Sequence, residues 1–116
     1  MAAAPIGPYS PVVRAGDWVV TSGQLGLEDG ALVAGGIAAE TKQVVENIAA
    51  RLAEHGAALT DVVKTLCILR SLDDFDAFNA AYVEAFGDHR PTRSTFEGGL
   101  VRGALVEIEA WAYRPL

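Results

Sequence analysis

The chain has 116 residues, which is enough sequence for one domain and too little for a second catalytic domain. Its net charge of −6 argues against a nucleic-acid partner, because neutralising a phosphate backbone requires clustered Lys and Arg, and the sequence has no basic run. Hydrophobic residues make up 51% of the chain, yet no charge-free apolar run approaches the roughly 20 residues that cross a bilayer. We therefore expect one soluble domain over residues 1–116, with no membrane partner and with an apolar surface that favours a homo-oligomer.

Cys67 is the only cysteine, so a single chain contains neither an internal disulfide nor a cysteine-based zinc site. In its apolar surroundings Cys67 is expected to be a small buried hydrophobe. Neither histidine has a second partner at metal-ligand spacing, so we expect no metal ion. The first residues lack the positively charged segment and the long apolar stretch of a signal peptide, which predicts a cytoplasmic location.

The N-terminal part of the chain is predicted to form an extended arm and a hairpin. Prolines fix the backbone of residues 6–11, the expected arm. Tyr9 is the only large side chain of this arm, and it either anchors the arm or lines a pocket. Runs rich in β-branched residues at 12–14 and 18–22 flank a turn composition, which predicts two paired strands.

Gly23 follows the second of these strands. Because glycine has no Cβ, this position forms a bulge, allows the backbone to approach a ligand closely, or simply ends the strand. Several glycines in residues 25–36 predict a loop that holds one short strand. Apolar residues then recur at helical spacing between residues 37 and 55, which predicts an amphipathic helix.

Residues 61–69 are apolar on both faces, as expected for a central strand that is covered on both sides. Asn79 lies beside an aromatic stripe, and its amide either caps a loop or reaches a pocket. Two further strands are predicted at 92–97 and 104–113. Aromatic side chains at intervals of three and four residues predict a second helix whose stripe belongs to the core, namely Phe75, Phe78, Tyr82 and Phe86.

The predicted order is β-β-β-α-β-α-β-β, which indicates an α+β domain. Short crossovers place both helices on one face of a single mixed sheet. The opposite face is then left to pack against other subunits.

The last two strands are predicted to form a hairpin that carries unexpected charges. Alternation places Glu107 and Glu109 on the same face of the final strand. Glu107 either acts in catalysis or water positioning, or makes a salt bridge, and a structural role is equally open for Glu109. Arg93 either grips a carboxylate ligand with two parallel hydrogen bonds or pairs with a glutamate. We hypothesise that Arg93 and Glu107 form the polar end of one small-molecule pocket.

Several short motifs occur in a distinctive order between residues 5 and 112. They are IGPYS at 6–10, TSGQ at 21–24, DVVKT at 61–65, DDF at 73–75, Asn79, PTRS at 91–94 and VEIEA at 106–110. In these motifs the chain resembles the RidA/YjgF family of reactive-intermediate deaminases. The resemblance implies a chorismate-mutase-like fold that assembles as a homotrimer with clefts between adjacent subunits.

The activity implied by the resemblance is hydrolysis of short-lived 2-imino or enamine acids to 2-keto acids and ammonia, without a metal or organic cofactor. Position by position, Arg93 would bind the substrate carboxylate and Glu107 would orient the attacking water. The backbone at Thr95 and Gly23 would hold the reacting end. An imine is already electrophilic, so positioning and general-base help suffice without a covalent nucleophile. The remaining side chains that would line the cleft are Tyr9, Ser22 and Asn79.

Two features depart from the family pattern. Thr95 stands where many members have cysteine, and the link at 97–103 looks one residue shorter than usual and lacks a Leu-Pro pair. Two alternatives therefore stand beside the deaminase, a non-catalytic protein that binds small carboxylates and an endoribonuclease. The endoribonuclease fits poorly, because the chain is acidic and lacks a His pair for acid-base cleavage.

Overall fold

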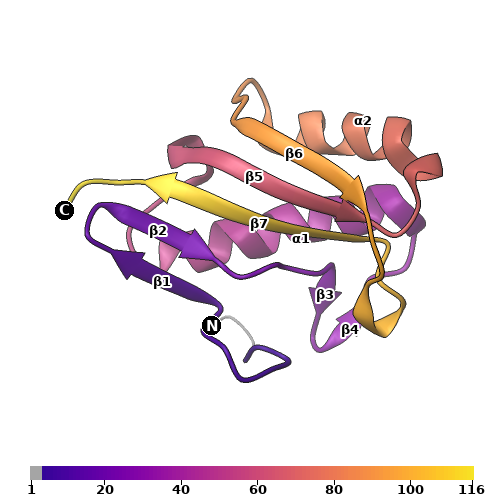
Figure 1. The fold of residues 1–116 in the computed structure, drawn as a ribbon, viewed down its shortest axis with the longest axis horizontal. Helices are drawn as coiled ribbons and strands as arrows, with labels where there is room; N and C mark the ends of the chain where they lie inside the picture. The colour runs from indigo at the N-terminus through magenta and orange to yellow at the C-terminus, as the bar shows by residue number, and fades with distance from the viewer. Residues whose placement is uncertain (1–3) are drawn as a thin grey trace.

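A computed structural model describes residues 4–116 and is built around a five-stranded mixed sheet (Figure 1). The strand order is β1-β2-β7-β5-β6, in which β5 and β6 are parallel and the other neighbours are antiparallel. Helices α1 (Gly36–Ala53) and α2 (Phe75–Phe86) pack against each other on one face of the sheet, as predicted. The strands of the sheet are β1 (Val12–Ala15), β2 (Trp18–Thr21), β5 (Val62–Leu69), β6 (Thr92–Glu97) and β7 (Val106–Tyr113).

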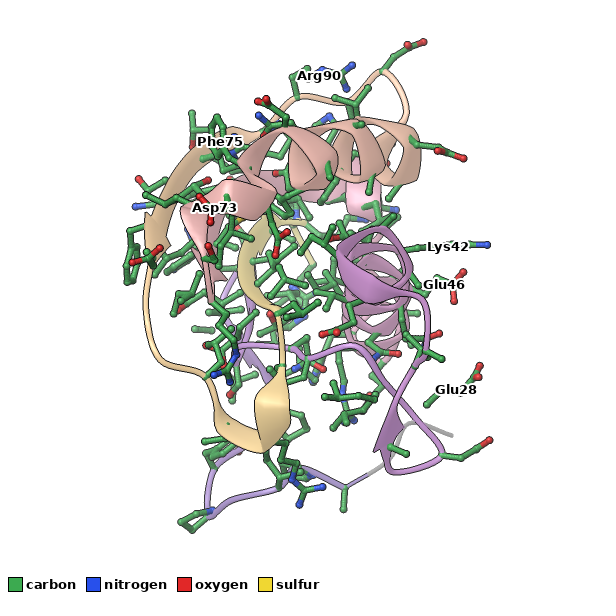
Figure 2. The ribbon with its side chains drawn as sticks, turned by 90° about the vertical axis from the view of Figure 1, so that its right-hand side faces the viewer. Glu28, Lys42, Glu46, Asp73, Phe75 and Arg90 are labelled. Carbon is green, nitrogen blue, oxygen red and sulfur yellow. The ribbon has the colours of Figure 1, made fainter. Side chains whose placement is uncertain are left out.

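The core lies between this sheet and the two helices. Alternate residues of β7 are completely buried against the helices, while the residues between them are only partly covered. The apolar stripes of α1 and α2 supply the other side of the core, and Figure 2 shows Lys42 and Glu46 of α1 pointing away from it. Full burial of a Val, Leu, Ile or Phe side chain stabilises the folded state by about 1.5–3 kcal/mol relative to an exposed side chain. The largest of these fully buried side chains include Phe78, Ile48, Leu52, Leu69 and Ile108.

The hairpin predicted between the last two strands is wrong. β5 lies between β6 and β7, so the two strands that carry Arg93 and Glu107 are not neighbours. The physical reason is that β6 pairs in parallel with β5 through the α2 crossover, whereas β7 pairs antiparallel with both β2 and β5. The link that follows β6, which includes a short 3-10 helix at Val101–Gly103, therefore returns the chain from the edge of the sheet to its centre.

The predicted loop at 25–36 contains two short strands where one was expected. β3 (Leu27–Glu28) and β4 (Ala31–Leu32) form an antiparallel ribbon outside the main sheet. Asp29 and Gly30 connect them with φ values of 53° and 84°, the positive pair that a two-residue type I′ turn requires. Asn47 of α1 anchors the ribbon, because its Nδ2 donates hydrogen bonds of 2.9 Å to the carbonyls of Leu25 and Leu27.

The face of the sheet opposite the helices is not covered by any element within residues 4–116. The helices therefore cover residues 61–69 on one side, and the predicted cover on the second side is absent from this part of a single chain. Lys64 lies over the Trp111 ring at 5.3 Å, and the side chains around this pair are mostly apolar. We call this surface the open face; its large apolar members are Val13, Trp18, Val20, Leu66, Ile68, Phe96, Trp111 and Tyr113. None of the helices described between residues 4 and 116 is long and apolar enough to cross a membrane.

Candidate active site

Arg93 lies on β6 and points to the side of the sheet that α2 covers, because its partner in the neighbouring strand is the fully buried Thr65. Its Nη2 donates a 2.8 Å hydrogen bond to Oδ1 of Asn79. Within residues 4–116 no carboxylate lies at ion-pair distance from Arg93. The charge is instead surrounded by aromatic rings of α2, with its Cζ at 4.9 Å from the centroid of Tyr82, 5.3 Å from Phe78 and 5.8 Å from Phe75.

The other titratable groups near Arg93 carry no negative charge that could neutralise it. Burial raises the pKa of the Tyr82 phenol, so this group stays protonated at neutral pH. Burial also raises the pKa of Cys67 to about 11, which confirms that Cys67 is a buried thiol and not a reactive one. The cation of Arg93 therefore faces neutral partners only and keeps its capacity to bind an anion.

Thr95 shares the face of Arg93, since it is the second residue after Arg93 on the same strand. Its partner in β5 is Cys67, and its buried hydroxyl lies close to the thiol of that residue. β6 is the edge strand of the sheet, so part of its backbone hydrogen-bonding capacity is free on the outer side. This position suits the backbone contact with a ligand that the family resemblance implies for Thr95.

Glu107 lies on β7 and points to the open face. Its carboxylate is half-buried, and no cation within residues 4–116 forms an ion pair with it. Burial raises the pKa of Glu107, and the negative charge of Glu109 raises it further. Burial likewise raises the pKa of Glu109, although Lys64 opposes that shift. Glu107 is therefore a stronger base than an ordinary exposed glutamate, which suits proton transfer.

Gly23 is in direct contact with the Glu107 side chain. Backbone hydrogen bonds between Gln24 and Ile108, of 2.8 and 3.1 Å, hold this segment against β7. A Cβ added at Gly23 would lie 2.5 Å from Oε2 of Glu107. The glycine therefore makes room for the Glu107 carboxylate of the same chain, whereas the close approach predicted at this position was to a ligand and stays a prediction.

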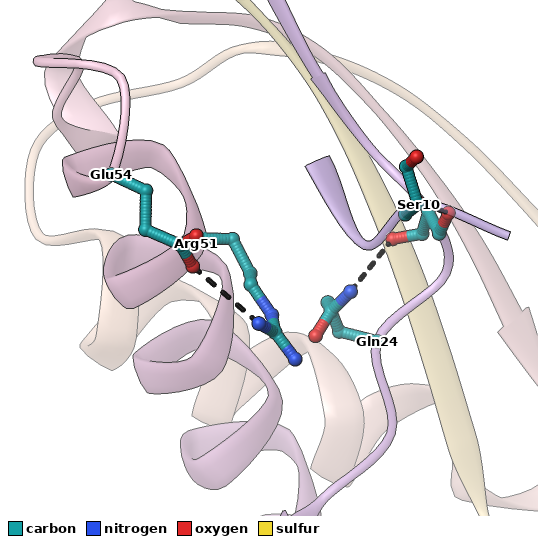
Figure 3. A network of polar contacts seen from close by, with 5 residues as sticks. Ser10, Gln24, Arg51 and Glu54 are labelled. Carbon is teal, nitrogen blue, oxygen red and sulfur yellow. Dashed lines mark hydrogen bonds and ion pairs between the residues drawn. The ribbon is translucent and has the colours of Figure 1, made fainter. Parts of the chain in front are cut away.

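Ser22 and Tyr9 belong to the segment that ties the N-terminal arm to this region. Ser22 Oγ donates a 2.6 Å hydrogen bond to the carbonyl of Ser10, and Gln24 Nε2 donates to the carbonyl of Ser22 (Figure 3). Tyr9 is 45% exposed and shares with Gly23 the lining of a cavity of about 420 Å³ between the arm and α1. Tyr9 thus lies on the arm, in the cavity that also reaches Gly23, the neighbour of Glu107.

The predicted residues form two groups that a single chain does not bring together. Glu107 is the register partner of Ile68, whereas Arg93 is the partner of Thr65, three residues earlier in the same strand. Because successive side chains of a strand point to opposite faces, an odd offset places the two charges on opposite sides of the sheet. The single pocket with both Arg93 and Glu107 that we predicted is therefore not formed within one chain.

The aromatic environment of Arg93 was missed by the sequence prediction. Phe78 and Tyr82 are core residues, as predicted, but they also form the surface on which the guanidinium rests. The prediction that Phe75 belongs to the core is wrong, because this residue at the start of α2 is 39% exposed. The sequence did contain a signal for the environment of Arg93, because the polar Asn79 lies beside the aromatic stripe. No group of three or more His, Cys, Asp or Glu side chains between residues 4 and 116 is placed to hold a metal ion.

Comparisons with known proteins show the family of the chain. Residues 1–114 match the family model described as Endoribonuclease L-PSP. A RutC family protein of Pyrococcus abyssi is 43% identical over 113 residues, which cover 95% of this chain and 89% of that protein. A human protein named 2-iminobutanoate/2-iminopropanoate deaminase is 38% identical over 110 residues, which cover 92% of this chain and 80% of the human protein.

A solved structure extends the similarity to three dimensions. The crystal structure of RidA from an Antarctic Psychrobacter has a TM-score of 0.91 and 38% identity, covering 97% of this chain and 93% of that chain. The chain belongs to the RidA/YjgF family, as its motifs predicted. Its relatives include named imine deaminases.

Proposed function

We propose that this protein hydrolyses reactive 2-imino acids and their enamine forms, such as 2-iminobutanoate, 2-iminopropanoate and 2-aminoacrylate, to 2-keto acids and ammonia. The observation that carries the proposal is Arg93, a cation that has no carboxylate partner within residues 4–116 and that Asn79 and three aromatic rings hold in place. Such a guanidinium suits the carboxylate that all these substrates share. The named deaminases among the relatives support the same reaction.

Assembly completes the site in this proposal. Arg93 and Glu107 point to opposite faces, so a small ligand that reaches both must lie between two chains. The apolar open face would be covered by such an assembly, which removes Trp111 and Phe96 from water. We propose a homotrimer in which each cleft combines Arg93 of one subunit with Glu107 of a neighbour.

The proposed reaction needs only positioning and one proton carrier. Arg93 binds the carboxylate and fixes the imine carbon next to a water molecule that Glu107 holds. Glu107 takes a proton from this water as its oxygen bonds to the imine carbon and the electron pair of the C=N bond moves to nitrogen. Protonation of the nitrogen then allows ammonia to leave as the carbonyl forms, so imino acid and water become keto acid and ammonia.

Imine decay in the presence of the purified protein tests this function. A threonine dehydratase generates 2-iminobutanoate in situ, and we expect the protein to accelerate its disappearance in proportion to protein concentration. Decay no faster than in buffer would refute the deaminase. Calorimetric binding of 2-oxobutanoate without such acceleration would instead support the non-catalytic carboxylate-binding protein.

Gly23→Ala tests the contact between this glycine and Glu107. The added methyl group would displace the carboxylate, the mobile end of its side chain. We therefore expect imine hydrolysis to fall about tenfold, with the free energy of unfolding lowered by less than about 1 kcal/mol. Gly99→Ala is the matched control, because a Cβ there meets no atom within 4 Å. Full activity of Gly23→Ala would show that the position of the Glu107 carboxylate does not matter.

A further inference from the structure

The hydroxyl of Tyr82 lies 2.7 Å from Oγ1 of Thr65. Both residues are deeply buried, at 4% and 0% exposure. Thr65 is also the direct register partner of Arg93 in the parallel pair of β5 and β6. Thr65 is thus next to Arg93 in the strand pairing and is also hydrogen-bonded to Tyr82.

The ring of Tyr82 is the aromatic group nearest to the guanidinium, at 4.9 Å from Cζ. Phe86 packs against this ring with a centroid distance of 4.7 Å, and Phe78 packs against it at 5.6 Å. The hydrogen bond to Thr65 fixes the far end of the ring. The ring is therefore held along its length, and its face offers a fixed surface to the cation.

Arginine has five N–H donors in a planar fork, and a bidentate grip on a carboxylate requires that this plane be correctly oriented. Asn79 accepts from one donor of Arg93, at Nη2. A single hydrogen bond leaves the guanidinium free to rotate about it, whereas a ring held below restricts that rotation. The orientation of the fork thus depends on Asn79 and Tyr82 together.

We infer that Tyr82, fixed by its hydrogen bond to Thr65, is a positioning residue that orients Arg93 and sets the preference of the site for carboxylate ligands. This inference rests on the proposed function, because it concerns the substrate clamp of the same site. Asn79 was already expected to line the cleft. Tyr82 and Thr65, in contrast, act through Arg93 and touch no substrate.

Calorimetry with 2-oxobutanoate and its neutral amide, 2-oxobutanamide, tests the inference on the assembled protein. We expect Tyr82→Leu to weaken 2-oxobutanoate binding about tenfold and amide binding less than about twofold. Tyr82→Phe keeps the ring, so its affinity for 2-oxobutanoate should fall by about threefold at most. Val19→Ala is the control for truncation of a buried side chain: Val19 is fully buried on β2, which β7 and β5 separate from the strand that carries Arg93. It should leave the carboxylate preference unchanged.

The hydrogen bond to Thr65 is tested by a double-mutant cycle, which also serves if Tyr82→Leu does not fold. Thr65→Val and Tyr82→Phe remove the two ends of one interaction, so the double variant should bind 2-oxobutanoate no more weakly than the worse single variant. Independent, additive losses would overturn the role of the pair.

The failure of the inference and that of the proposed function give different results. If the wild-type protein binds no 2-oxobutanoate, the proposed function fails and the inference falls with it. If the wild-type protein binds 2-oxobutanoate and a folded Tyr82→Leu variant keeps the wild-type preference for the carboxylate, only the positioning role is overturned. If Tyr82→Leu does not fold, the Tyr82→Phe and Thr65→Val variants decide the question in the same way. Equal weakening of acid and amide would also overturn it, because a general structural defect does not distinguish the two ligands.

Discussion

Arg93→Ala is expected to lower kcat/KM for 2-iminobutanoate by at least about 100-fold, because two charge-assisted hydrogen bonds to the substrate carboxylate are lost. The fold should be little affected. The side chain is half-buried and donates a hydrogen bond to Asn79, so its removal should lower the free energy of unfolding by about 1 kcal/mol. Steady-state kinetics with imine generated in situ, together with thermal unfolding, measure both effects.

Two variants make this experiment specific. Arg93→Lys keeps the charge and loses the planar fork, so we expect activity between those of wild type and Arg93→Ala. Arg90→Ala is the control for removal of a nearby cation, since Arg90 is exposed and its guanidinium donates hydrogen bonds to the backbone carbonyls of Gly87 and His89. Near-normal activity of Arg93→Ala would eliminate Arg93 as the carboxylate clamp.

Mixing two inactive variants should restore activity if each site combines residues from two subunits. Arg93→Ala and Glu107→Ala are each expected to be inactive as pure proteins. When equal amounts are co-assembled at random, about a quarter of the clefts receive an intact Arg93 from one subunit and an intact Glu107 from its neighbour. We therefore expect about a quarter of the wild-type activity, measured as imine decay per subunit.

The matched control replaces the two single variants by wild type and the Arg93→Ala/Glu107→Ala double variant. Shared sites again predict about a quarter of full activity, whereas sites contained within one chain predict about half. Mixed single variants that stay inactive, although mass spectrometry shows that their subunits have exchanged, would contradict the shared site.

Local sequence patterns predicted the elements of this fold well. Strand alternation and helical spacing gave boundaries within a few residues for the main strands and for α1 and α2. These patterns depend on neighbouring residues and on which side of an element is buried. The ribbon of β3 and β4 was predicted only as a loop with one short strand, because its two strands have two residues each, which is too short to produce a periodic signal.

Local sequence patterns could not predict which distant strands pair with each other. Whether β7 pairs with β6 or inserts between β2 and β5 depends on contacts far apart in the chain, and the apolar alternation of β7 is compatible with both. The relation of Arg93 to Glu107 follows from this pairing and from the register with β5. The family resemblance could therefore name both residues, whereas only the structure placed them on opposite faces.

The alternation of β7 also has a consequence for folding. A slip of this strand by one residue would turn Glu107 and Glu109 towards the helices and bring Ile108 to the open face. Two carboxylates would then enter an apolar core without cations, at a cost of several kcal/mol each. The acidic pair thus disfavours mispairing of the central strand while the sheet forms, a role in folding that is separate from any role in the proposed site.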